Sequence, residues 1–316
     1  MKIKLSYILI TLISLWLSSC SHKEILCPGT EVRQVNICFD WDRAPDASPE
    51  GMTLYFFPTF QGGMIWKFDI AGSQGGPIEL PTGTYRMIAY NNDLPGVTVT
   101  DTDSYDHMTA NARTIAAEKN CTSTGMLYGA VIDRIEVTPC GVSYTTAQGS
   151  IKECPRSLIH CAPDSLSTLY TVTITNVNGI ERVKSASVLL NGVASSLVFN
   201  HSTPLDYPAT LQFPLDCKYA TSQLRASACA FASPPDSETP YRLTLVVTRT
   251  DGKSFSRDFD VSQQVMNSFS PRNVIITIDG IDIPSGDITP PDHDVGGIEV
   301  DVDGWNIIEV DIESTV

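Results

Sequence analysis

Apolar and polar residues alternate with a period of two along most of this chain. In VRQVNICFDW, the alternation puts Val35, Ile37, Phe39 and Trp41 on one face of an extended strand. Further runs rich in Val, Ile, Thr, Tyr and Phe follow, with Gly, Pro, Asn or Asp between them: MTLYFFP, GMIWKFDIAG, PIELPTGTYRMIAY and TGMLYGAVIDRIEVTP. This pattern is typical of strands in an all-β sandwich and does not fit alternating strands and helices. In this half, segment 107–120 (HMTANARTIAAEKN) is the one place where a short helix is plausible.

A second series of strand patterns begins near Leu166. It consists of TLYTVTITNV, VKSASVLLNG, SSLVFN, ATLQFPL and NVIITIDGIDI, and it includes the clearest hairpin, YRLTLVVTRTDGKSFSRDFDV. There we expect Asp251 and Gly252 to form a type I′ turn, whose central residues both need positive φ angles. Between the two series, residues 149–164 contain cysteines, prolines and polar residues without a clear period. We therefore predict two tandem β-sandwich domains, at residues 31–155 and 156–283.

The first residues of the chain indicate export. Residues 1–4 include two lysines, thirteen mostly apolar residues follow at 5–17, and the run closes on LSSC, which ends at Cys20. A positive start, a short apolar core and small residues before a break are typical of a secretory signal, and the core is too short to span a bilayer. The sequence LSSC also resembles a bacterial lipobox, in which the cysteine becomes lipidated. We therefore expect a lipoprotein signal peptide at 1–20 with Cys20 as the lipidation site, then a tether at 21–30; the alternative is a plain signal peptide.

Cysteine usage fits export as well. Without Cys20, eight of the nine cysteines remain, an even number that makes disulfides plausible in an exported protein. Sequence does not choose among the pairings, although Cys154 with Cys161 and Cys217 with Cys229 could each close a short loop. Free buried thiols are the alternative.

Charge excludes one class of partner. The net charge of −15 argues against nucleic acid, since binding phosphates needs clustered Lys and Arg. After Arg272 there is no Lys or Arg, while Asp and Glu together occur eleven times. These acidic residues would bind a partner or keep the protein soluble, or they simply form a face that is exposed to water.

Known catalytic signatures do not occur in the sequence. It has no HExxH, GxSxG, P-loop or GxGxxG opening a helix, and its five histidines are scattered. The glycines of AGSQGG, from Ala71 to Gly76, lie between strand patterns and favour a hairpin loop over a phosphate cradle. His107 fits a surface loop. We therefore predict a protein that is not an enzyme, with no catalytic residues, no metal site and no cofactor.

The acidic C-terminal segment, residues 284–316, begins with a Pro-, Gly- and Asp-rich linker and continues as IEVDVDGWNIIEVDI. An EF-hand calcium loop would need a bidentate Glu at its twelfth position, where Val310 stands. A hairpin that turns at Asp303 and Gly304 fits better. Its aliphatic face consists of Ile298, Val300, Val302, Ile308, Val310 and Ile312. The hairpin would either pair with a partner by strand exchange or complete its own sandwich.

Several of these segments together resemble a known family. A lipobox is followed in order by VNICFDWD, PEGMTLYFFP, ELPTGTYRMIAYNND and GMLYG. This order is similar to that in the fimbrillin-associated lipoproteins of type V pili, and most of all to their FimB-like anchor subunits. The resemblance covers most of the chain and is strongest between Val32 and Tyr128.

The resemblance implies a fold and a mechanism. It implies two tandem transthyretin-like sandwiches and assembly by strand exchange, in which an emptied groove of one subunit accepts a C-terminal strand of the next. An anchor would keep its own N-terminal strand, stay at the outer membrane and cell surface through the lipid on Cys20, and offer its C-terminal hairpin to a fimbrial stalk or accessory pilin. Cleavage after Arg33 or Arg43 would instead produce a stalk or tip subunit.

An alternative from another class is a surface lipoprotein whose β-sandwich binds glycan or a host ligand, and a tip or accessory pilin is a further possibility. Glycan sites use exposed aromatic platforms. Trp66, in GGMIWKF, is the best candidate for such a platform, with a buried strand residue as the alternative reading. Trp41 and Trp305 fit a core or an interface.

Overall fold

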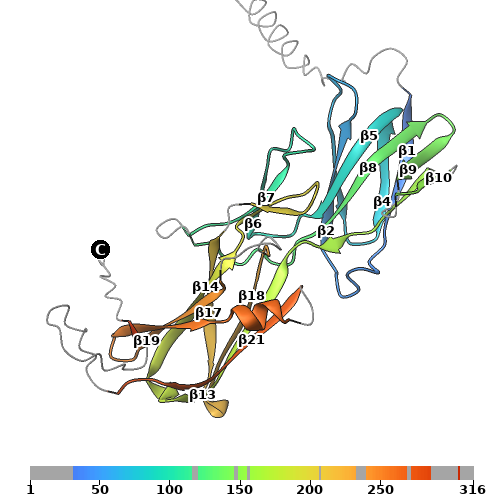
Figure 1. Cartoon of the computed structure of the whole chain (residues 1–316). Helices are drawn as coiled ribbons and strands as arrows, with labels where there is room; N and C mark the ends of the chain where they lie inside the picture. Colours follow the sequence, from blue (N-terminus) through green and yellow to red (C-terminus); the bar gives the residue numbers. More distant parts are fainter. Residues whose placement is uncertain are drawn as a thin grey trace, which may run out of the picture.

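The structure is a computed structural model that describes residues 31–115, 120–145, 149–154, 157–205, 208–232, 240–268, 272–285 and 305–306. The regular structure in these residues is almost entirely β, so the predicted all-β class is confirmed. Figure 1 shows an elongated arrangement, with the N-terminal strands at one end, the C-terminal strands at the other, and β6 and β7 between them.

Two sheets form the N-terminal sandwich. The smaller has the order β11-β1-β4, and the larger has the order β10-β9-β8-β5-β2-β3 with β12 paired to β8. The bounds are β1 Val32–Phe39, β4 Gly75–Pro81 and β11 Leu158–Cys161 for the first. For the second they are β2 Gly51–Pro58, β3 Trp66–Ala71, β5 Gly83–Asn91, β8 Tyr128–Thr138, β9 Gly141–Thr145, β10 Ile151–Cys154 and β12 Asp164–Ser165.

Strand β5 shows why the alternation in the sequence produces this sandwich. Tyr85, Met87 and Ala89 belong to the core between the two sheets, while Ile88 and Tyr90 point to the outer face of the larger sheet. In a strand, successive side chains point to opposite faces, so the apolar outer positions mark a face that is itself covered. The sandwich core thus uses only one of the two apolar faces of β5.

The C-terminal half forms one larger sheet with the order β21-β13-β18-β17-β14-β19-β20-β22. Its strands are β13 Thr168–Asn178, β14 Val183–Val193, β17 Ala209–Lys218, β18 Gln223–Ala230, β19 Arg242–Arg249, β20 Ser254–Asp260, β21 Asn273–Asp282 and β22 Trp305–Asn306. Strand β17 changes partner along its length, from β14 at Ala209–Leu215 to β18 at Asp216–Lys218. Short 3-10 helices lie at Ile180–Arg182 and Tyr219–Thr221, and helix α2 spans Ser262–Met266.

A small sheet joins the two halves. Its order is β16-β15-β7-β6, with β6 at Val97–Thr100, β7 at Thr109–Ala112, β15 at Ser196–Val198 and β16 at Thr203–Leu205. The helix considered for residues 107–120 is therefore wrong over β7, which pairs with β6 and β15. Pairing with a distant strand overrides the local helical tendency of the Ala-containing run.

The β19–β20 hairpin is confirmed, but its turn differs from the prediction. Gly252 has a φ of 86°, whereas Asp251 is not among the residues with positive φ, so the turn is not type I′. The amide of Gly252 donates to the carbonyl of Arg249, and the amide of Arg249 donates to that of Lys253. This is the three-residue loop that ends in a left-handed glycine.

The predicted boundary between residues 155 and 156 falls just before a strand of the first sandwich. Strand β11 pairs in parallel with β1 through Asn36 opposite Leu158 to Phe39 opposite Cys161. One buried apolar cluster also runs from Phe57 and Ile88 of the N-terminal sandwich into the C-terminal sheet. The division into two transthyretin-like domains stays a prediction.

Candidate functional site

Strand β1 occupies the centre of the smaller N-terminal sheet. It pairs antiparallel with β4 from Val32 opposite Pro81 to Cys38 opposite Gly75, and in parallel with β11. The side chains of Val35, Ile37 and Phe39 are 0, 3 and 5% exposed, and they fill one side of the sandwich core. A strand bonded on both edges and buried on one face is integral to its sheet.

The two arginines considered as cleavage sites lie in different settings. Arg33 is inside β1, opposite Leu80 of β4, and forms an ion pair with Glu31 at 3.0 Å. Arg43 is exposed in the turn that follows β1. A protease needs an extended, accessible segment, and exposed loops are the usual sites of nicking. Arg43 is therefore the accessible position of the two, and a cut there would separate β1 from the rest of the chain.

The glycines of the segment 71–76 are explained by the approach of β4 to β1. Gly72 and Gly75 have positive φ angles of 73° and 96°, and a Cβ on Gly75 would overlap the carbonyl of Ile37. Glycine is thus required by backbone contact and turn geometry. The predicted loop lies between β3 and β4, but it is not a hairpin loop. β3 pairs with β2 in the larger sheet and β4 with β1 in the smaller one, so the loop crosses from one sheet to the other.

The outer edge of β21 is closed by a side chain. Gln264 of α2 accepts a hydrogen bond from the amide of Thr277 at 2.8 Å and donates one to the carbonyl of the same residue at 3.0 Å. β21 is a terminal strand of its sheet, and Ile275 on it is 60% exposed. An open edge of this length would template pairing with another chain, and Gln264 occupies its middle.

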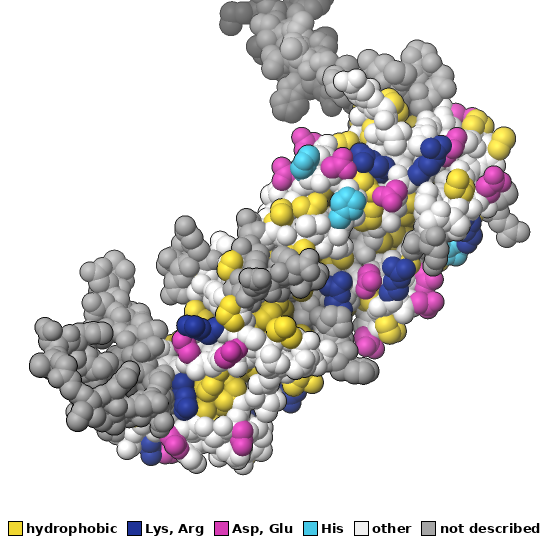
Figure 2. Space-filling model, in the orientation of Figure 1, with side chains coloured by type: hydrophobic (Ala, Val, Ile, Leu, Met, Phe, Trp, Pro, Cys, Tyr) yellow, Lys and Arg dark blue, Asp and Glu magenta, His cyan; other side chains and the backbone are white. Residues whose placement is uncertain are grey.

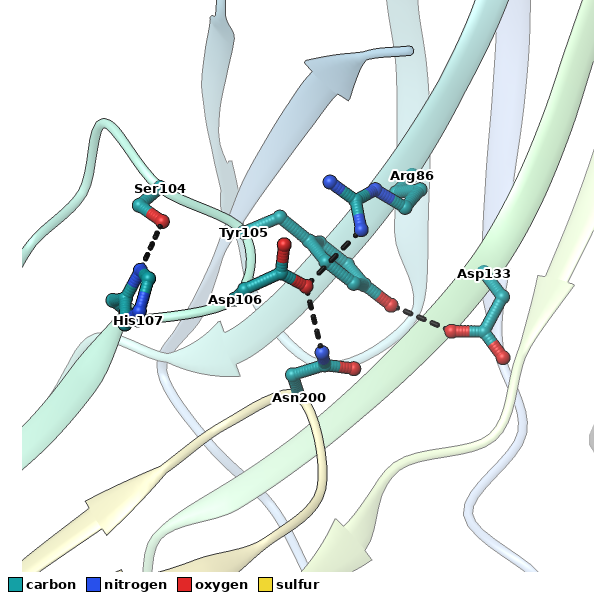
Figure 3. Close-up of polar contacts among 7 residues, drawn as sticks. All are labelled: Arg86, Ser104, Tyr105, Asp106, His107, Asp133 and Asn200. Carbon is teal, nitrogen blue, oxygen red and sulfur yellow. Dashed lines mark hydrogen bonds and ion pairs between the residues drawn. The ribbon is translucent and has the colours of Figure 1, made fainter.

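A polar and aromatic cluster connects three separate parts of the chain (Figure 3). The hydroxyl of Tyr105 donates to Oδ1 of Asp133 on β8 at 2.7 Å, and the guanidinium of Arg86 on β5 lies 4.0 Å from the Tyr105 ring centroid. Asp106 accepts from Arg86 at 3.1 Å and from Asn200 at 3.1 Å. Burial, together with the hydrogen bond to Asp133, raises the pKa of Tyr105. The cluster fastens the loop before β7 and the β15–β16 turn to the N-terminal sheet.

Sequence reasoning did not find this cluster. Its residues are separated by between one and more than a hundred positions, and no motif links them. Only His107 was singled out, and it lies in the exposed loop as expected, where its Nδ1 is 2.9 Å from Oγ of Ser104.

Two hollows lie beside the joined sheets. The first has a volume of about 580 Å³ and contains mixed charges, among them Arg43, Lys152, Asp42 and Asp164. The second, of about 480 Å³, lies over Tyr55 and Tyr90 on the outer face of the larger N-terminal sheet. Figure 2 shows acidic and basic side chains interspersed over the visible face. This mixture fits neither a phosphate track nor a strongly acidic docking face.

The predicted lipidation site Cys20 and the predicted strand-exchange residues lie outside the described residues; the latter are Ile298, Val300, Val302, Ile308, Val310 and Ile312. From the closing segment, the structure describes only β22, in which Trp305 is opposite Arg257 and Asn306 is opposite Ser256 at the edge of β20. The strand-exchange role of the side chains in this closing segment therefore stays a prediction.

The tryptophans of the N-terminal half are packing residues. Trp41 donates from Nε1 to the carbonyl of Ser73 at 2.7 Å, and its ring meets that of Tyr128 edge-on at 5.5 Å. Trp66 lies opposite Phe56 of β2, which places it on the side of the sandwich core. The reading of Trp66 as an exposed platform is therefore wrong, because the register of β3 turns it inward.

Cysteines in the described residues are all free, including both pairs considered for local disulfides, Cys154 with Cys161 and Cys217 with Cys229. Burial raises the pKa of Cys161 to about 12 and that of Cys121 to about 11, which keeps both thiols protonated. Within the described ranges, no three His, Cys, Asp or Glu side chains gather in a way that could hold a metal ion. Nor does any helix in that part of the chain have the length and apolar character needed to span a bilayer.

Comparison with known proteins places these features in context. A family model described as a domain of unknown function, DUF5119, matches residues 19–214. A relative from Bacteroides ovatus, named as a candidate fimbrium anchoring subunit, Fim4B, is 29% identical over 130 residues. That match covers 39% of this chain and 38% of the relative, so well under two thirds of its length is spanned. It confirms the resemblance to fimbrial anchor proteins that the sequence motifs indicated.

Solved structures resemble the fold over most of its length. A candidate adhesin from Bacteroides ovatus superposes with a TM-score of 0.61 at 19% identity, covering 82% of this chain and 95% of that one. The fimbrial anchor protein Mfa2 from Porphyromonas gingivalis gives a TM-score of 0.49 at 14% identity, covering 79% and 89%. At such identities the first likeness establishes the fold alone.

Proposed function

The chain belongs to the DUF5119 family, and we propose that it is a lipid-anchored structural subunit of a bacterial type V pilus, which fixes or nucleates fimbriae at the outer membrane. Its partners would be fimbrial stalk or accessory pilins, joined by strand exchange, and the membrane itself through a lipid on Cys20. The name of the Bacteroides ovatus relative supports the fimbrial role, and the lipobox at residues 17–20 supports the lipid.

The observation that carries this proposal is the position of β1. The covalent connection from Cys20 to the fold runs through residues 21–31 and then through β1, which is bonded on both edges and buried on one face. Eleven residues extend at most to about 38 Å, at roughly 3.5 Å each. With β1 retained, a lipid on Cys20 would therefore hold the sandwich close to the membrane.

Cleavage at Arg43 would have the opposite consequence. It would leave the lipid on a fragment that contains β1, and the rest of the chain would be held to that fragment only by hydrogen bonds and by the packing of Val35, Ile37 and Phe39. An anchor subunit must therefore escape this cut, whereas a stalk subunit would use it to open a groove for an incoming strand.

The C-terminal segment would be the strand offered to the next subunit. Its aliphatic and acidic residues alternate, which suits pairing along a sheet edge with one face buried. The backbone pairing of β22 with the edge of β20 supports the idea that this segment adds to sheets, and it also fits the alternative that the segment completes its own sheet.

The test is to determine the mature N-terminus of the protein in purified fimbriae by mass spectrometry. We expect a lipidated Cys20 and an uncut Arg43. A new N-terminus just after Arg43 would make the protein a stalk or tip subunit and refute the anchor role. Its absence from fimbriae would refute the pilus role altogether. An Arg43→Lys variant, which keeps the charge but resists arginine-specific proteases, is the matched control and should assemble as the natural protein does.

A further inference from the structure

The hollow over Tyr55 and Tyr90 lies on the outer face of the larger N-terminal sheet. Strands β2, β3 and β5 form its floor, and residues from Leu94 to Thr102, including β6, form one wall. Its volume of about 480 Å³ is within the range of small-molecule sites. The face is separate from the sandwich core, because Thr53 and Tyr55 alternate with the core residues Met52, Leu54 and Phe56.

A row of stacked aromatic rings lies on the floor. Tyr55 and Tyr90 are diagonal neighbours across the β2–β5 pair, since Thr53 lies opposite Tyr90 and Tyr55 opposite Ile88. Their ring centroids are 6.4 Å apart and the ring planes differ by only 12°. Phe57, which is buried, continues the row, with its centroid 6.0 Å from that of Tyr55 at 21°. Both tyrosines are only partly buried, so part of each side chain is open to solvent.

The rings are fixed from behind and from the side. The centroid of Phe199, which follows β15, lies 5.2 Å from that of Tyr90. Phe57 meets Tyr105 edge-on at 5.7 Å, and Tyr105 is held by Arg86 and Asp133. Aromatic side chains with locked rotamers lose little entropy when a ligand binds. The cluster in Figure 3 therefore supports one end of this row of rings.

A polar rim stands beside the rings. The hydroxyl of Thr53 donates to Oδ1 of Asp69 at 2.5 Å, and Nδ2 of Asn92 donates to Oγ1 of Thr53 at 3.1 Å. Lys67 lies opposite Tyr55, with its Nζ 3.3 Å from Oδ2 of Asp69 and 5.9 Å from the Tyr55 ring centroid. Asp69, Lys67 and Asn92 are all exposed, so their remaining donors and acceptors face solvent.

Charge at the rim is balanced. Burial works to raise the pKa of Asp69, but hydrogen bonds from Thr53 and Lys67 and the charge of Lys67 outweigh it, so the pKa is lowered and the group is a carboxylate. The adjacent ammonium of Lys67 offsets this charge. A ligand with a strong net charge would therefore gain little here, whereas one with many hydroxyl groups would find both donors and acceptors.

We infer that this hollow binds a neutral oligosaccharide, with the C–H groups of a sugar ring packed against the exposed parts of Tyr55 and Tyr90 and its hydroxyls bonded by Asp69, Lys67 and Asn92. A pyranose combines C–H groups with a periphery of hydroxyls, which matches partly exposed aromatic side chains with a polar rim beside them. The inference concerns a ligand of the sheet face and does not depend on the pilus role. It also relocates the glycan site considered from the sequence, since Trp66 faces the core while its neighbour Lys67 faces this hollow.

The first step of the test is to probe an array of neutral, sialylated and sulfated oligosaccharides with the purified protein. The strongest neutral oligosaccharide is then titrated by NMR in the millimolar range. We expect binding to neutral oligosaccharides, weakened about tenfold or more by Tyr55→Ala, which corresponds to about 1.4 kcal/mol. Asp69→Ala and Asn92→Ala change exposed residues, so they test the rim without removing packing, and each should weaken binding as well.

Phe60→Ala is the matched control, because Phe60 is an aromatic residue of the same half that is 60% exposed and outside the hollow. It should bind as the natural protein does. The inference is overturned if no neutral oligosaccharide binds on the array or in solution, if only acidic glycans bind, or if the Asp69 and Tyr55 variants keep full affinity. Melting curves of each variant separate loss of binding from loss of fold.

Discussion

Replacing Gln264 by alanine should open the outer edge of strand β21. The side-chain amide of Gln264 accepts from the amide of Thr277 at 2.8 Å and donates to the carbonyl of Thr277 at 3.0 Å. A hydrogen-bonded residue of an antiparallel neighbour would exchange the same two bonds. Helix α2 has only five residues, far too few to be stable alone, so its position depends on contacts such as these.

The size of the effect follows from the number and setting of the bonds. Each hydrogen bond contributes about 0.5 to 1.5 kcal/mol net, and water can replace both bonds at this exposed edge. We therefore expect the opening of this edge to become easier by about 1 to 2 kcal/mol, which corresponds to roughly a 5- to 30-fold change in an equilibrium constant. Amide exchange of Thr277 should accelerate by that factor.

The assay is residue-resolved hydrogen exchange by NMR, combined with light scattering over a range of protein concentrations. Gln263→Ala is the matched control, since the Gln263 side chain accepts from Asn267 at the end of the same helix, at 3.2 Å. Gln264→Glu keeps an acceptor for the Thr277 amide but cannot donate to the Thr277 carbonyl, so it should lie between the alanine variant and the natural protein. The freed edge should also increase concentration-dependent association.

The reasoning would be refuted if Thr277 exchanged at the same rate in Gln264→Ala as in the natural protein. Equal acceleration in Gln263→Ala would also refute it, because the effect would then come from fraying of α2 and not from the loss of the two bonds to β21.

Three further predictions concern the junction, the thiols and the membrane link. Tyr105→Phe removes the 2.7 Å hydrogen bond to Asp133 and should lower the free energy of unfolding by about 1 to 3 kcal/mol in urea denaturation; an unchanged midpoint would show that the bond adds no stability. Exposed Cys140 should react with a maleimide in the folded protein, and buried Cys161 only after unfolding, so equal rates would contradict its burial. Burial raises the pKa of Cys161 to about 12, above the value of about 8.5 for a free thiol. The contribution of this thiol to the free energy of unfolding is therefore complete below a pH of about 8.5 and is lost as the pH rises towards 12. Cys20→Ser should move the protein from the membrane fraction to the soluble fraction of cells, and retention in the membrane would exclude the lipid anchor.

The side of the sheet that each strand residue faces is the feature of the fold that the alternation of apolar and polar residues predicted best. The alternation in β1 correctly grouped Val35, Ile37 and Phe39 as residues of one buried face. The prediction succeeded because a strand with one covered face must repeat every two residues. It failed at 107–120, where no periodicity in the segment indicates that Thr109–Ala112 pairs with a strand almost ninety residues later.

The residues considered for a glycan site show the same difference between what the sequence and what the tertiary structure decide. The alternation of side chains along a strand puts Trp66 and Lys67 on opposite faces of β3. The sequence alone does not show which of these faces is the core, so it favours the aromatic Trp66 as the candidate. Tyr55 and Tyr90 looked like ordinary strand residues. Their rings stack only because β2 and β5 are neighbours in a register that sets Thr53 opposite Tyr90.

The sequence by itself determined the all-β class, the positions of most strands, the absence of known catalytic signatures and the resemblance to fimbrial lipoproteins, because each depends on residues close together in the chain. Tertiary structure alone decided the pairing of β1 with β11, the closure of the β21 edge by Gln264, and the meeting of Arg86, Tyr105 and Asp133. These contacts join residues that are distant along the chain, and local patterns carry no information about which sheet edge or which face a distant segment will reach.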